Sequence, residues 1–189
     1  GAKASGSPPV VANTELWNGT NWTETTDINV TRYIGATANT GTTSSAINFA
    51  GTTPPGSGVA DTEEWTGAGA AVGAWSTGTS INTARYGMTS AGIATAGIIS
   101  GGNASPAYTE EYDGTSWTEV NDLNLARVLL GSSSNAPYTA SLAFGGAGPS
   151  PTQAQTELWN GTNWTEVNDL NTARYDVRGT GPFSDGLAA

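Results

Sequence analysis

The chain has 189 residues, a formal net charge of −10 with only six basic residues, and neither cysteine nor histidine. These counts exclude disulfides, thiol chemistry and zinc–sulfur sites, and they disfavour nucleic acid as a partner, because phosphate binding needs clustered lysine and arginine. The 26 glycines and the abundant threonine favour short strands and tight turns over long helices. No apolar run is long enough to span a membrane. The length suits one all-β domain.

A repeated phrase organises this domain. TELWNGTNWTE begins at Thr14 and returns at Thr156, and weaker copies begin at Thr62 and Thr109, at spacings of 48, 47 and 47 residues. Further landmarks keep step with it: each unit has a tryptophan followed ten residues later by an arginine, and a glutamate within the repeated phrase. The tryptophans are Trp22, Trp75, Trp117 and Trp164, the arginines Arg32, Arg85, Arg127 and Arg174, and the glutamates Glu15, Glu63, Glu110 and Glu157. This period predicts four copies of one supersecondary unit.

Each unit reads as four short strands in chain order. The first follows the arginine, as in Tyr86–Ala91, and the second ends at a glycine pair, as in AGIISGG at 96–102. The third carries the glutamate, as in Thr109–Tyr112, and the fourth carries the tryptophan, as in Trp117–Val120. Asn-Gly or Asp-Gly at 18–19, 113–114 and 160–161 stands between the third and fourth strands, where a hairpin favours positive φ. The asparagine seven residues after each tryptophan is expected to cap a turn through its side chain.

A glycine pair, then an aromatic residue, then a tryptophan, in a four-stranded unit of this length, resembles the kelch repeat. The clearest copy is 96–127, and one unit departs from the pattern with Ala50–Gly51 in place of the glycine pair. The wording of the repeat also resembles repeats in predicted virion proteins of marine bacteriophages. The kelch resemblance implies a four-bladed β-propeller of four-stranded blades. Its units would span approximately 1–32 with 174–189, then 32–84, 85–126 and 127–173.

The two ends of the chain carry complementary parts of one unit. The C-terminal stretch supplies the first two strands and the N-terminal stretch supplies the last two, so we expect the ring to close through one shared blade. Sharing would remove the sheet edges that a linear array exposes. The alternative architectures are a fragment of a larger ring and an open array that pairs with a second chain.

The repeated arginines and glutamates are interpreted as structural contacts, because a ligand site seldom needs four equal copies. The repeated tryptophans are interpreted as packing between blades. Specificity should lie where the copies differ. These places are the insert at 66–74, the loops 52–60, 103–108 and 147–155, and the innermost strand of the C-terminal stretch, which carries Asp176 and Arg178. The candidate binding residues are Tyr108, Asp176, Arg178 and Trp75.

We expect a non-catalytic binding or structural module, because triad and general-base chemistry usually depends on histidine. No cofactor is expected, and calcium is disfavoured because the acidic spacing is not that of an EF-hand. The partner would be a glycan or protein surface, or a second copy of the chain. The phage resemblance implies a virion or tail-fibre domain that touches surface glycans. The alternative is a purely architectural or engineered propeller with no ligand.

Overall fold

The computed structural model describes residues 10–37, 44–53, 55–67, 74–103, 107–133, 135–148 and 152–189. All strand pairing within these ranges is antiparallel, and none of these residues lies in a helix. Accordingly, this part of the chain holds no helix that could cross a membrane. The expected all-β class is confirmed.

Three four-stranded sheets follow one another along the chain. The first has the order β3-β4-β7-β8, with bounds Ala36–Thr37, Ser45–Phe49, Thr62–Thr66 and Ala74–Thr77. The second has the order β9-β10-β11-β12, with bounds Thr89–Ile93, Ala96–Ser100, Thr109–Tyr112 and Trp117–Val120. The third has the order β13-β14-β15-β16, with bounds Gly131–Ser132, Ser141–Phe144, Thr156–Trp159 and Trp164–Val167. A small hairpin, β5–β6 (Thr52–Thr53 and Ser57–Gly58), lies between β4 and β7.

The remaining strands form two separate hairpins, one from each end of the chain. The N-terminal hairpin consists of β1 (Glu15–Trp17) and β2 (Trp22–Glu24), and the C-terminal hairpin of β17 (Gly179–Thr180) and β18 (Leu187–Ala188). Trp17 lies opposite Trp22 in the N-terminal hairpin, as Trp159 lies opposite Trp164 in the third sheet. Each hairpin therefore reproduces one half of the four-stranded unit.

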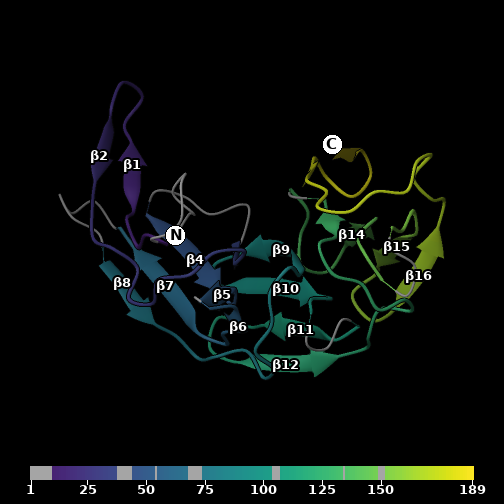
Figure 1. Ribbon diagram of the computed structural model, residues 1–189, viewed down its shortest axis with the longest axis horizontal. Coiled ribbons are helices and arrows are strands. Elements are labelled where there is room, and N and C mark those ends of the chain that lie inside the picture. The colour runs from purple at the N-terminus through teal and green to yellow at the C-terminus, as the bar shows by residue number, and fades with distance from the viewer. Residues whose placement is uncertain are drawn as a thin grey trace.

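Figure 1 shows the three sheets side by side along an arc, with β8, β12 and β16 on its outer side. The N-terminal hairpin stands at one end of this arc and the C-terminal segment at the other, with an opening between them. The pairings found in the described residues do not include one between β18 and β1. The structure thus holds both halves of the expected fourth sheet without joining them.

The hairpin turns form where the dipeptides predicted them. Gly19, Gly114 and Gly161 have φ of 97°, 92° and 91°, a conformation that costs glycine little. The preceding Asp113 accepts hydrogen bonds from the backbone N–H groups of Thr115 and Ser116, and these bonds lower the pKa of its carboxyl. The local sequence therefore fixes these turns.

The first strand of the second sheet begins later than predicted. In the second sheet β9 starts at Thr89, whereas the sequence pattern suggested Tyr86. The reason is the backbone at Gly87, which has φ of 69° and gives its carbonyl to the N–H of Leu129. A left-handed residue interrupts an extended strand, so regular pairing starts only after it.

The core lies between the sheets. Phe49 of the first sheet meets Trp117 of the second edge-on, with ring centroids 5.2 Å apart. Between the second and third sheets, Ala91 and Ile98 pack in one buried cluster with Trp159 and Trp164. Each sheet is therefore stabilised mainly by its neighbours along the arc.

Candidate functional site

Each of the three complete sheets holds the connection that leads into it through one buried ion pair. Arg32 pairs with Glu63 in the first sheet, Arg85 with Glu110 in the second, and Arg127 with Glu157 in the third. All six side chains are almost fully buried. The guanidinium of Arg127 lies 2.7 Å from the Glu157 carboxylate and also donates to the carbonyls of Gly145 and Gln155. Such coverage is what a buried arginine requires.

The carboxylate of each pair also binds the incoming backbone. Glu157 accepts hydrogen bonds from the N–H groups of Asn124 and Leu125, which lie on the connection into the third sheet. Burial lowers the pKa of Arg127, and the adjacent Glu157 charge opposes that shift. The pair therefore fastens the connection to the sheet and leaves neither charge free to bind a ligand.

A second set of contacts joins neighbouring sheets. The indole N–H of Trp117 donates to the Thr62 hydroxyl of the preceding sheet at 3.1 Å, and Trp164 donates to Thr109 at 3.0 Å. Trp75 donates in the same way to Thr14, beside the N-terminal hairpin, at 3.0 Å. These bonds use the tryptophans as links between sheets.

The repeated asparagines reach across space rather than capping a local turn. The side-chain amide of Asn124 donates to the Trp164 carbonyl at 3.0 Å, and Asn82 donates to the Trp117 carbonyl at 3.4 Å. The expectation of a local cap fails because the asparagine lies on the connection that runs over the following sheet, where a strand carbonyl is within reach.

A cavity of about 270 Å³, called the axial cavity below, is lined by Arg32 and by the segments that follow Arg32, Arg85, Arg127 and Arg174. Its wall is formed by Arg32, Ile34, Gly35, Thr37 and Asn48, together with 87–88, 129–130 and 176–178. The residue two places after each repeated arginine has positive φ: Ile34, Gly87, Leu129 and Asp176, at 54°, 69°, 56° and 56°. Backbone bonds join successive members, since Leu129 N–H donates to the Gly87 carbonyl and Asp176 N–H donates to the Leu129 carbonyl. These bonds hold non-glycine residues in a strained conformation around the cavity.

Two of the predicted binding residues meet in this wall. An Arg178 guanidinium nitrogen lies 3.7 Å from an Asp176 carboxylate oxygen, and both side chains are exposed. A third polar group lines the same cavity: the buried Oδ1 atom of Asn48 has no hydrogen-bond partner. Asn48 was missed from the sequence, although its departure from the apolar Ile99 and Ala143 at the same repeat position was a usable signal.

The other two predicted binding residues lie elsewhere. Tyr108 is half-buried, and its backbone carbonyl accepts a hydrogen bond from Gly101. Trp75 is also half-buried, with its ring 5.6 Å from that of Trp65 and its N–H bound to Thr14. Neither side chain belongs to the axial wall, and Trp75 acts in packing.

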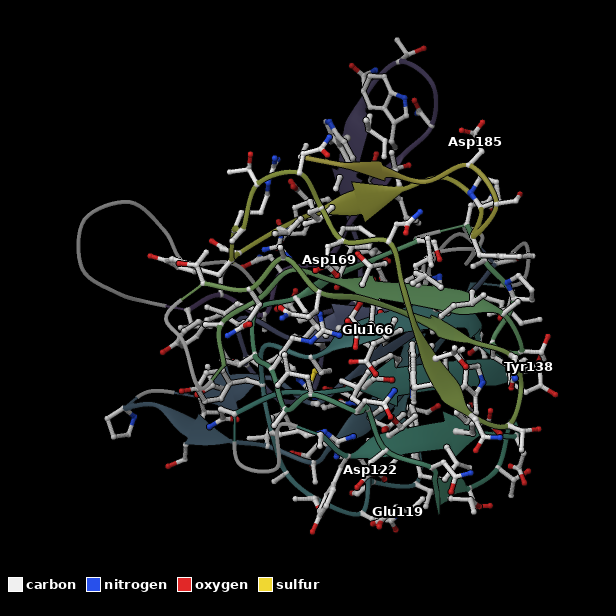
Figure 2. The ribbon with its side chains drawn as sticks, turned by 90° about the vertical axis from the view of Figure 1, so that its right-hand side faces the viewer. Glu119, Asp122, Tyr138, Glu166, Asp169 and Asp185 are labelled. Carbon is white, nitrogen blue, oxygen red and sulfur yellow. The ribbon has the colours of Figure 1, made fainter. Side chains whose placement is uncertain are left out.

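The acidic residues of the outer strands do not converge. Figure 2 shows Glu119 and Asp122 well separated from Glu166 and Asp169, their equivalents in the next sheet. Asp122 accepts a hydrogen bond from Thr109 N–H, and Asp169 accepts one from Thr156 N–H, so both have structural roles. No group of three or more acidic side chains suited to a metal ion occurs within the described ranges.

Comparisons with family models and with curated proteins do not indicate a function for this chain. No family model matches it, and no curated protein matches it either. The geometry of the axial cavity and of the contacts between sheets therefore carries the functional argument.

Proposed function

We propose that this chain is a four-bladed β-propeller of kelch-like blades, closed by its two terminal hairpins, that acts as a non-catalytic recognition module. The observation that carries this proposal is the axial cavity, whose wall takes residues from the inner segments of all four units. A linear array would not bring the first and fourth inner segments to one cavity. The phage-like wording of the repeat favours a virion domain that recognises surface glycans.

The contacts between units support closure. Within the described residues, arginine–glutamate pairs and tryptophan–threonine bonds each occur three times, and the residues that would form a fourth set do not meet. Continuing the pattern, Arg174 would pair with Glu15, and Trp22 would donate to Thr156. Arg174, Glu15 and Trp22 are all exposed in the open arc. Closure would bury Trp22 as its counterparts Trp117 and Trp164 are buried.

The register of the complete sheets defines how the two hairpins would join. Leu142 lies opposite Leu158 in the third sheet, and Ile98 lies opposite Glu111 in the second. The equivalent pair in the fourth sheet is Leu187 with Leu16. Directly opposed residues on antiparallel strands have Cα atoms about 4.5–5.5 Å apart, which is within the range that a disulfide bridges.

The closing test uses the absence of native cysteine. We expect the Leu16→Cys/Leu187→Cys variant to form an intramolecular disulfide under mild oxidation, detected as a faster-migrating monomer on a non-reducing gel. The control Thr23→Cys/Leu187→Cys should remain open, because those residues would be two strands, or about 9–10 Å, apart. A disulfide-linked dimer in dilute solution, or no disulfide in the Leu16 variant, would overturn closure within one chain.

Recognition is tested separately on a glycan array. Saturable binding to a defined subset of glycans, lost after denaturation, is expected. The absence of catalysis is supported by the lack of histidine and cysteine and by the burial of Glu63, Glu110 and Glu157 against arginine. An array without binding above background would overturn glycan recognition and would not contradict the propeller fold.

A purely architectural role is the second candidate. The observation that favours it is the use of the repeated aromatic residues inside the protein: Trp65, Tyr112 and Trp159 are buried, and Trp75 bonds to Thr14. Few repeated aromatic faces are left for a ligand. This role predicts that a virion assembled without the domain loses stability and keeps its host range.

A further inference from the structure

The axial wall departs from the repeat at the positions that carry its polar groups. Asp176 stands where the other units have Ile34, Gly87 and Leu129, and Arg178 stands where they have Ala36, Thr89 and Gly131. Asn48 takes the place of Ile99 and Ala143. Three independent departures therefore face one cavity. A purely structural repeat would have no need of them, because the unaltered positions serve the other blades.

The charges of this wall define what it can bind. The first three repeated arginines are buried in ion pairs, whereas the Arg178 side chain is 85% exposed and has a single carboxylate at 3.7 Å. Such an exposed pair contributes little, so the guanidinium remains available for a carboxylate that it can bind through two hydrogen bonds. Asp176 and Asn48 Oδ1 offer acceptors for hydroxyl groups.

The volume of the cavity and the net charge of the chain restrict the class of ligand further. A cavity of about 270 Å³ lies below the usual range of drug-sized pockets and suits a single sugar ring. The net charge of −10 repels polyanions at long range, which disfavours a polymer that is acidic at every unit. One carboxylate on an otherwise neutral ligand fits both conditions.

We propose that the axial cavity binds a single acidic sugar of the uronic-acid type, with Arg178 holding its carboxylate and Asn48 and Asp176 accepting from its hydroxyl groups. This proposal rests on the proposed recognition function and assigns it a site and a sugar class. The strained left-handed backbone at Asp176, held by its bond to the Leu129 carbonyl, keeps the carboxylate at the wall.

The repeat itself supplies variants that the fold accommodates. Arg178→Thr, Asp176→Leu and Asn48→Ala each install the residue that another unit carries at the same position. Glu166→Gln, at an exposed position of β16, is the matched surface control. The probes are methyl glucuronide and methyl glucoside, which share one ring and differ in the carboxylate. Titration calorimetry on the whole chain gives Kd for each pair.

We expect methyl glucuronide to bind at least about tenfold more tightly than methyl glucoside, as the loss of a charge-assisted hydrogen-bond pair implies. Arg178→Thr should abolish this preference, and Asn48→Ala and Asp176→Leu should weaken both sugars. Glu166→Gln should behave as the unaltered chain. Equal affinity for the two sugars, or a preference that survives Arg178→Thr, would overturn the proposal. The proposal would also be overturned if the disulfide test shows a closed chain and that chain does not bind methyl glucuronide. That result would not contradict the proposed propeller fold.

Discussion

The same eleven residues occur twice in this protein and have two different environments. TELWNGTNWTE spans 14–24 and 156–166. In the third sheet its two tryptophans, Trp159 and Trp164, are 1% and 6% exposed, whereas in the N-terminal hairpin Trp17 and Trp22 are 47% and 64% exposed. Both copies form the same hairpin with the same register.

This contrast separates local from neighbouring effects. The turn and the register of the hairpin are the same in both places, so they follow from the turn dipeptide and the cross-strand pairing. Burial of the tryptophans requires two neighbours: an inner pair of strands and a preceding sheet. The third sheet has both, and the N-terminal hairpin has only the following sheet. Its exposed tryptophans mark the interface that the proposed closure would complete.

The largest expected effect on the free energy of unfolding comes from replacing Arg127, and the comparison with Arg174 tests closure. Arg127→Ala should lower the free energy of unfolding by about 3–5 kcal/mol, because it leaves Glu157 buried without its partner. Under closure, Arg174→Ala should cost a comparable amount through Glu15. Urea unfolding followed by tryptophan fluorescence measures both variants. If Arg174→Ala lowers the free energy of unfolding by less than about 1 kcal/mol, as expected of an exposed ion pair, the Arg174–Glu15 pair does not form in solution.

The tryptophans sharpen the same comparison. Trp164→Ala should cost about 3–5 kcal/mol, as large-to-small changes of buried aromatic residues do. Trp22→Ala should approach that value if the ring closes and should have little effect if it stays open. Calorimetric melting of both variants, beside Thr165→Ala on the same strand as Trp164, distinguishes the outcomes. A near-zero cost for Trp22→Ala would contradict closure.

The smallest effect concerns the carboxyl group of Glu111. Burial raises the pKa of this carboxyl above its usual 4.5. A raised folded-state pKa in an acid means that stability falls as pH rises from the unfolded pKa through the folded one. Glu111→Leu, which installs the residue found at Leu158, should therefore stabilise the protein more at pH 7 than at pH 4. Melting temperatures at both pH values test this, and an equal change at both would contradict it.

The sequence was informative wherever local chemistry decides. The third and fourth strands of the second sheet begin and end as predicted, at Thr109–Tyr112 and Trp117–Val120. The turns between them follow from glycine's tolerance of positive φ. The first strand was placed too early, because the left-handed backbone at Gly87 is imposed by a bond to Leu129 in the next unit. That contact lies beyond any local pattern.

The candidate site divides in the same way. Asp176 and Arg178 were predicted because they interrupt an otherwise small-residue strand, and both line the axial cavity. Trp75 was also predicted to bind, and its indole N–H donates to Thr14, 61 residues away in the chain. Its part in binding stays a prediction. Asn48 was overlooked because an asparagine within a strand has meaning only when its buried oxygen is seen without a partner.

By itself, the sequence determined the all-β class, the four-fold period and the hairpins, because turn chemistry and strand alternation act within a few residues. Only the tertiary structure decided which carboxylate each arginine meets, which tryptophans are buried and which polar groups share the axial cavity. Those features depend on distant segments becoming neighbours, such as Arg127 with Glu157, Trp164 with Thr109, and Asn48 with Asp176. These features are stabilised by burial and by pairing between sheets, and a local sequence pattern contains no information on either.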